Sequence, residues 1–191
     1  SHGSIMPRHL SDCDDTEVMI NALRDMPDTI DIKAAGTAMR FLTSYLSVAE
    51  GEEHVITGTE RMKHRPIAIL VDALRYLGAD ISYEGEEGYP PLRIKGKALE
   101  GGHLEITGSV SSQYISALLM IGPALKNGLE LKMTGNIASR PYIDLTLWMM
   151  REFGAEAEWS DIATGTVKPT PYRQHDYIIE SDWSAASYWY E

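Results

Sequence analysis

The order of apolar and polar positions along the chain predicts an alternation of helices and strands. Apolar residues recur at helical spacing in segments that begin with capping residues or proline, and two of these segments end at glycine. The predicted helices cover residues 11–26, 34–50, 66–77 and 141–154. Short alternating runs bounded by Gly, Glu and Pro predict strands. These strands cover residues 29–34, 54–58, 81–85, 91–96, 103–108 and 129–135, and TERMKHRP (59–66) and NIAS (136–139) are expected to be loops.

The stretch LEITGSVSSQYISALLMIGPAL, at residues 104–125, combines a strand, a polar turn and the start of an apolar helix. Gly108 and Ser109 form the turn, and two serines and a glutamine open the helix. Hydroxyl residues at a helix start leave the first backbone N–H groups pointing outward, where a hydroxyl can cap them or an anion can bind. An ordinary N-cap is the first interpretation, and an anion site is the alternative.

The same pattern recurs along the chain, which predicts an internal repeat. HVITG, RP and LGADI are followed about 75 residues later by LKMTG, RP and FGAEA. IKAAGTAMRFL, ITGSVSSQYIS and IIESDWSAASYW occupy equivalent places. The repeat predicts an α+β domain (α/β by some schemes) made of βαβαββ units, complete once in the middle and partial on each side. Chance similarity of short βα units is the alternative.

If the repeated units pack their first helices side by side, three helix N-termini meet at one end of the domain. They lie at Gly36 and Thr37, at Ser111 and Ser112, and at residues 182–184. Helix N-termini attract anions, so this end is a candidate anion platform.

Composition narrows the classes of protein and ligand. Hydrophobic residues make up 43% and charged residues 24% of the 191 residues, which is typical of a soluble globular protein. No apolar run approaches a membrane span, and the net charge of −11 argues against general binding to nucleic acid or anionic membranes. An anionic ligand therefore needs a local basic patch. The six histidines show no paired metal spacing, and no metal is expected.

Cysteine content and the ends of the sequence add two expectations. Cys13 is the one cysteine, so an internal disulfide is excluded; together with the lack of a recognisable secretory signal this points to the cytoplasm. Its place beside a helix start predicts a small buried thiol. The start SHGSIMPRHL, without an initiator methionine, and an end inside an expected helix predict an excised piece. Residues 1–9 are then a tag remnant with a native lead-in, and residues 10–191 form one domain.

Five ordered motifs, AAGTAMRFL, GTERMKHRPI, GSVSSQYISALL, SRPYIDLTL and SDWSAASY, resemble the 5-enolpyruvylshikimate-3-phosphate (EPSP) synthase family. The resemblance extends from about residue 10 to the end. It implies an inside-out α/β fold of two halves, each with three βαβαββ units in pseudo-threefold symmetry around inner helices. This chain resembles most of the N-terminal half, without the native N-terminus and the C-terminal half, its intramolecular partner.

The resemblance also implies an activity of the shikimate pathway. The family transfers the enolpyruvyl group of phosphoenolpyruvate to the 5-hydroxyl of shikimate 3-phosphate, through a tetrahedral intermediate that loses phosphate. It uses no metal or organic cofactor. Because the active site lies between the halves, this chain alone is expected to lack turnover and at most to bind shikimate 3-phosphate weakly.

Motif by motif, the resemblance assigns substrate contacts to the chain. Gly36 is expected to lie against phosphoenolpyruvate, which Arg65 grips with a bidentate fork. Thr37 caps the same helix, and a purely structural role stays open. Ser111 and Ser112 are expected on the substrate phosphate, with Gln113 between the two substrates.

Further matches supply a second group of site residues. Ser139 and Tyr142 are expected to contact shikimate 3-phosphate, and Arg140 is a weaker phosphate neighbour. Arg40 fits the basic position of its motif, but an internal ion pair that stabilises the fold is an equal alternative. Asp182 matches the family aspartate only as a capping or supporting residue, because SDWSAAS departs from the family's GDxSSAS.

Three other functions are alternatives. A non-catalytic binding module could keep the fold without the chemistry. The related UDP-N-acetylglucosamine enolpyruvyl transferases use a cysteine on a mobile loop, and residues 60–64 contain none. The RNA 3′-phosphate cyclase group requires nucleic-acid surfaces, against which the acidic charge argues.

Overall fold

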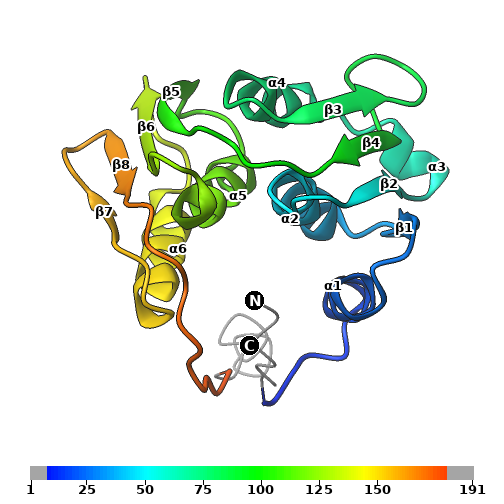
Figure 1. Ribbon diagram of the computed structural model, residues 1–191, viewed down its shortest axis with the longest axis horizontal. Helices are drawn as coiled ribbons and strands as arrows, with labels where there is room; N and C mark the ends of the chain where they lie inside the picture. Colours follow the sequence, from blue (N-terminus) through cyan, green and yellow to red (C-terminus); the bar gives the residue numbers. More distant parts are fainter. Residues whose placement is uncertain (1–7, 180–191) are drawn as a thin grey trace, which may run out of the picture.

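The computed structural model describes residues 8–179, which contain two four-stranded sheets of the same topology (Figure 1). The first has the order β1-β2-β4-β3 and the second β5-β6-β8-β7. In each sheet the first pair of strands is parallel, and the other pairs are antiparallel. The strands are β1 (Thr29–Asp31), β2 (Glu53–Thr57), β3 (Asp80–Tyr83), β4 (Leu92–Lys95), β5 (Gly102–Thr107), β6 (Leu129–Thr134), β7 (Ala157–Trp159) and β8 (Thr164–Val167).

Two complete βαβαββ units are therefore present. The prediction of a repeat is confirmed, but the prediction of only one complete copy is wrong: β1, though three residues long, pairs in parallel with β2 and completes the first unit. β5 pairs in parallel with β6 and opens the second unit.

The first helix of each unit lies at the centre of the molecule. These helices are α2 (Gly36–Ser47) and α5 (Ser112–Ile121), which pack against each other with the sheets outside them (Figure 1). α5 is buried on nearly every side, with Ile115, Leu118 and Leu119 fully enclosed. Burial of such apolar side chains is the main stabilising term for the two units.

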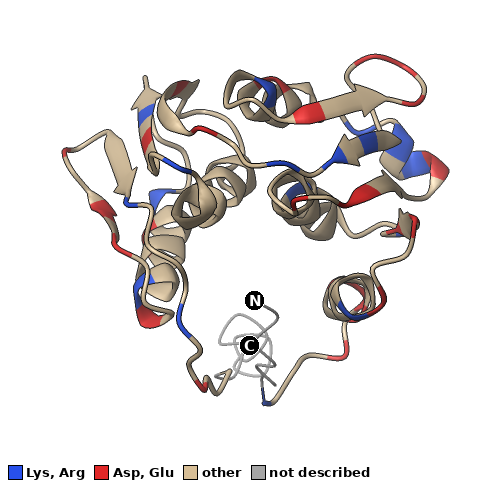
Figure 2. Cartoon of the chain, viewed as in Figure 1, with Lys and Arg blue, Asp and Glu red and all other residues tan. Residues whose placement is uncertain are grey.

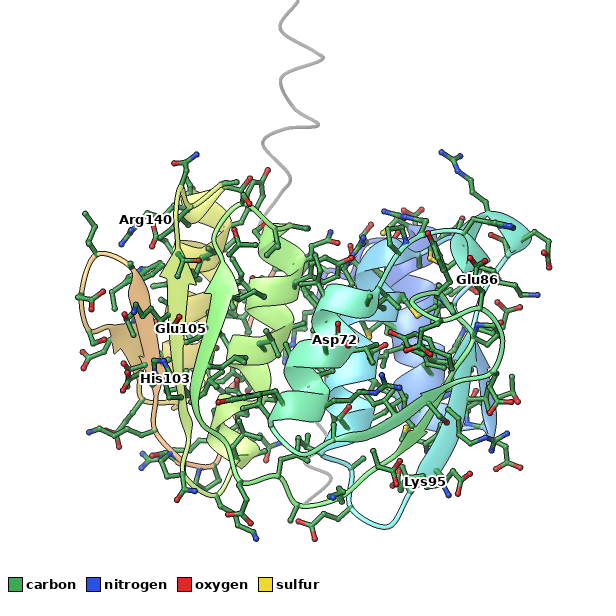
Figure 3. All side chains as sticks on the ribbon, turned by 90° about the horizontal axis from the view of Figure 1, so that it is seen from above. Asp72, Glu86, Lys95, His103, Glu105 and Arg140 are labelled. Atoms are coloured by element: carbon green, nitrogen blue, oxygen red, sulfur yellow. The ribbon has the colours of Figure 1, made fainter. Side chains whose placement is uncertain are left out.

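The second helix of each unit lies further out. α4 (Ala68–Tyr76) contacts both β3 and β5, and Figure 3 shows it, with Asp72, between the two sheets. α6 (Arg140–Glu152) packs against α5, and α1 (Asp14–Asp25) packs against α2. Strand β6 alternates buried and exposed residues, so one face of its sheet meets the helices and the other meets solvent. None of the helices in residues 8–179 is long and apolar enough to cross a bilayer.

Most predicted elements are confirmed, with local differences. The expected loop at 59–66 contains a one-turn helix, α3 (Glu60–Lys63), whose Met62 is buried. The helix expected from residue 66 begins at Ala68. A 3₁₀ turn at Gly122–Ala124 follows α5. Arg8 and Ile178 form an isolated parallel bridge outside the two sheets.

The prediction of a buried thiol at Cys13 is wrong. Cys13 is exposed at the N-cap position of α1, where the first turn faces solvent. Its Sγ lies 3.3 Å from Thr16 Oγ1, and hydrogen bonds with Ser11 and Thr16 lower the pKa of the thiol. The predicted third helix start, with Asp182, and the aromatic residues after it lie outside the described residues.

Candidate functional site

The N-termini of α2 and α5 meet through the side chain of Gln113. Its Nε2 donates to Thr37 Oγ1 at 2.9 Å, and its Oε1 accepts from Arg40 Nη1 at 2.7 Å. These bonds join residues more than 70 positions apart in the sequence. The prediction that the two helix starts lie side by side is therefore confirmed.

Two arginines lie against the backbone of Gly36. A Cβ added to Gly36 would lie 2.5 Å from Arg65 Nη1 and 2.9 Å from Arg40 Nη1. Any side chain at this position would displace one or both guanidinium groups. The absence of a Cβ at Gly36 therefore lets both guanidinium groups approach the backbone closely.

No carboxylate within residues 8–179 lies within ion-pair distance of either guanidinium group. The predicted ion pair of Arg40 is thus not formed in this part of the chain: Arg40 donates to Gln113 and, at 3.1 Å, to the carbonyl of Gly36. Its Nε is buried and has no partner among the described residues. Two adjacent cations without a counter-charge repel each other, so an anion placed between them would be stabilised.

Basic residues are concentrated around this point although the whole chain is acidic. Arg61 and Arg65 line a hollow of about 430 Å³ together with Ala34, Thr59 and Met62. Figure 2 shows the basic residues of α3 at the right of the view. The local basic patch that the sequence required for an anionic ligand is present in the structure.

The start of α5 offers hydroxyl groups and backbone N–H groups. Ser111 Oγ accepts from the backbone N–H of Gln113 at 3.3 Å and caps the helix. The hydroxyl of Ser112 is half-buried and has no hydrogen-bond partner within the described part of the chain. Ser111 therefore has a structural role, whereas Ser112 is free to bind a ligand.

Thr37 does not cap α2. The N-cap position belongs to Ala35, no side chain caps the helix, and the Thr37 hydroxyl accepts from Gln113 instead. The prediction of a cap was wrong because a contact from the other unit determines the orientation of this side chain. The first backbone N–H groups of α2 are consequently left without a side-chain cap.

A groove of about 980 Å³ begins at these helix starts and runs along α6. Four predicted residues line it: Thr37, Ser112, Gln113 and Tyr142. The side chain of Tyr142 is 66% exposed. The sequence analysis did not predict the apolar residues that line this groove. Those on α6 could have been found from the helical spacing of exposed apolar positions. The missed residues include Phe41, Met120, Leu145 and Met149.

Two further predicted site residues, Ser139 and Arg140, lie at the start of α6. Ser139 takes the N-cap position in a left-handed conformation, with φ 55° and no side-chain cap. The guanidinium of Arg140 stacks on Trp159, with Cζ 3.9 Å from the ring centroid, and donates to the carbonyl of Ile162. Figure 3 places Arg140 at the edge of the molecule. The structure does not bring Arg140 to Gly36 and Gln113.

The chain resembles known proteins in sequence and in structure. The family model described as EPSP synthase (3-phosphoshikimate 1-carboxyvinyltransferase) matches residues 8–191. A 3-phosphoshikimate 1-carboxyvinyltransferase of Bacteroides fragilis is 61% identical over 191 residues, which are 100% of this chain and 46% of that protein. The enzyme of the same name from Haemophilus influenzae is 48% identical over 158 residues, 81% of this chain and 37% of that protein.

The structural comparison supports the same fold. The EPSP synthase of Acinetobacter baumannii superposes with a TM-score of 0.81 at 22% identity, over 95% of this chain and 45% of that chain. In all these comparisons the chain spans about half the length of the relatives it matches, or less.

Proposed function

Because the chain belongs to the EPSP synthase family, we propose that it supplies the N-terminal half of a 3-phosphoshikimate 1-carboxyvinyltransferase. The complete enzyme would transfer the enolpyruvyl group of phosphoenolpyruvate to the 5-hydroxyl of shikimate 3-phosphate and release phosphate. A cytoplasmic location belongs to the same proposal, and a single exposed cysteine agrees with a reducing compartment.

One observation carries the proposal: Arg40 and Arg65 lie together on Gly36 without a carboxylate in the described residues, and Gln113 connects Arg40 to the start of α5. Both proposed substrates carry phosphate and carboxylate groups. Guanidinium groups and helix N-termini are the groups that bind such anions most effectively. The site therefore has the charge and the donors that two adjacent anionic substrates require.

Within this site, Gly36 and Arg65 are assigned to phosphoenolpyruvate. Arg65 is exposed and makes no side-chain bond within residues 8–179, so its five N–H donors are available to a ligand. Gly36 permits the ligand and the guanidinium group to approach the backbone. The positive charge at this point would stabilise the negative charge of the departing phosphate.

Ser112 and Gln113 are assigned to shikimate 3-phosphate, with Ser111, Ser139 and Tyr142 beside them. Ser112 offers a free hydroxyl, and Tyr142 presents an exposed ring to the same groove. Gln113 contacts the Arg40 side of the site and lines the groove, so it suits a position between two substrates. Turnover would require the other half of the enzyme, which would close over this surface.

The proposal is tested by phosphate release from phosphoenolpyruvate in the complete gene product that carries this chain. Release should depend on shikimate 3-phosphate. Replacing Arg65 by Ala removes a charge-assisted contact worth about 1.5–3 kcal/mol, so the KM for phosphoenolpyruvate should rise at least about tenfold.

Arg61→Ala is the matched control, because it removes the same charge four residues earlier and from the same hollow. It should change the KM for phosphoenolpyruvate less than about twofold, as expected for a solvated charge. A wild-type protein that binds the substrates without releasing phosphate would favour a non-catalytic binding module. Equal effects of the two replacements would contradict the assignment of Arg65.

A further inference from the structure

Tyr114 contacts Arg40 with its ring and Pro66, the residue after Arg65, with its hydroxyl, although it follows the Ser-Ser-Gln motif and belongs to the buried side of α5. Its side chain is 8% exposed and lines neither the groove nor the basic hollow. No sequence motif assigned it a role. Its two polar interactions, one through the phenol oxygen and one through the ring face, both lead to the anion site.

The phenol oxygen holds the segment that carries Arg65. Tyr114 Oη donates to the carbonyl of Pro66 at 2.8 Å. Pro66 is bonded directly to Arg65, and as a proline it has no N–H of its own with which to fix the segment. On the other side the backbone N–H of Arg65 donates to Met62 at 3.0 Å. The peptide that carries Arg65 is thus held between α3 and α5.

The ring face supports the second arginine. Cζ of Arg40 lies 5.1 Å from the centroid of the Tyr114 ring, within the range of a cation–π interaction. The buried Nε of Arg40 has no hydrogen-bond partner in the described residues, so the ring supplies a favourable surface where a polar partner is missing. Nη1 of the same guanidinium group donates to Gln113 Oε1 and to the carbonyl of Gly36.

We infer that Tyr114 is a positioning residue that sets both guanidinium groups of the anion site without touching a substrate. The inference rests on the proposed function for its kinetic consequence and on geometry alone for its structural one. Because Tyr114 lies next to Gln113 on α5, it also fixes the arginines relative to the helix start at which the second substrate would bind. Its loss should therefore weaken binding of the substrate that the arginines hold.

Tyr114→Phe removes the bond to Pro66 and keeps the ring under Arg40. A hydrogen bond of this kind corresponds to a change of about three- to tenfold. In the complete gene product, the KM for phosphoenolpyruvate should rise by that factor, and the KM for shikimate 3-phosphate should change less than about twofold.

Ser47→Ala is the matched control. The buried hydroxyl of Ser47 donates to the carbonyl of Thr43 at 2.7 Å, at the end of α2 away from Gly36, and lines neither the groove nor the basic hollow. Its replacement removes the same type of bond and should leave the ratio of the two KM values unchanged. A parallel rise of both KM values in Tyr114→Phe would indicate a general loss of structure and would overturn the inference.

The double variant Tyr114→Phe, Arg65→Ala tests the route of the effect. If Tyr114 acts through Arg65, removal of the phenol oxygen adds nothing once Arg65 is absent, and the KM for phosphoenolpyruvate equals that of Arg65→Ala. Additive effects would show that Tyr114 acts by another route.

A spectroscopic measurement separates this inference from the proposed function. In the ¹⁵N-arginine-labelled protein, Tyr114→Phe should shift the side-chain Nε–H signal of Arg65, and Ser47→Ala should leave it in place. An unmoved signal would overturn the inference even in an active enzyme. A shifted signal, where the wild-type protein shows no phosphate release, would support the positioning role and reject the proposed activity.

Discussion

At the scale of single residues, the missing Cβ atom matters for function at Gly36 and for folding at Gly96. A Cβ at Gly36 would meet the flexible ends of Arg65 and Arg40, which can move. A Cβ at Gly96 would lie 1.8 Å from the carbonyl oxygen of Ala49 and 2.8 Å from that of Leu46, which are backbone atoms and cannot. The first glycine therefore makes room for the site, and the second for close packing of the chain on α2.

This difference predicts opposite results for the two alanine variants. Gly36→Ala should raise the KM for phosphoenolpyruvate more than that for shikimate 3-phosphate, with little change in thermal stability. Gly96→Ala should lower the free energy of unfolding by about 1–3 kcal/mol. Steady-state kinetics and denaturant titration of the complete gene product check both. Equal effects of Gly36→Ala on the two KM values would contradict its placement beside phosphoenolpyruvate.

At the scale of elements, α5 combines the core of the molecule with its site. Its N-terminus carries the ligand-facing serines, and the rest of the helix is packed between α2, α4 and α6. The groups that would bind a phosphate therefore stand on a rigid element, which keeps their geometry fixed before a ligand arrives.

Loss of packing in α5 should be costly. Leu118 is fully buried, so Leu118→Ala should lower the free energy of unfolding by about 2–5 kcal/mol. Leu23→Ala in α1 is the control, because Leu23 is 44% exposed and the same truncation should cost no more than about 0.5 kcal/mol. Chemical denaturation monitored by tryptophan fluorescence measures both. Similar losses in the two variants would contradict the central position of α5.

The sequence predicted elements better than it predicted contacts between them. The sequence predicts an apolar helix at α5 and an alternating strand at β6, and both predictions are confirmed. The strand Thr164–Val167 was not predicted, because its TGTV sequence is too short to show a clear alternation. Pairing with β6 and β7 makes this segment a strand.

Local sequence patterns could not predict the side-chain contacts between the two repeat units. The bond from Tyr114 to Pro66 joins residues 48 positions apart, and Thr37 binds Gln113 in place of its own helix start. Exposure of Cys13 depends on which side of α1 faces α2, which its sequence neighbours do not specify. Motif resemblance named Gly36 and Arg65, but only the fold shows that they touch.

At the scale of the whole molecule, an acidic chain places two cations at its candidate site. The net charge is −11, yet Arg40 and Arg65 lie together at Gly36, the start of α2. The overall field repels anionic substrates, so their capture depends on these local groups. The two sheets and their helices form a scaffold that brings residues of both repeat units to a single surface.

The central claim is that the starts of α2 and α5 form the substrate surface of a carboxyvinyl transferase half. Ser112→Ala tests it most cleanly, because the Ser112 hydroxyl has no partner within residues 8–179 and its loss leaves the fold intact. Ser109→Ala is the control: Ser109 lies in the preceding turn, where its hydroxyl pairs with Thr107 at 2.9 Å.

The measurement is a calorimetric titration of shikimate 3-phosphate into the complete gene product. A hydrogen bond to a charged group corresponds to about 1.5–3 kcal/mol, so Ser112→Ala should weaken binding at least about tenfold, and Ser109→Ala less than about twofold. Absence of binding to the wild-type protein, or an affinity unchanged by Ser112→Ala, would contradict the account.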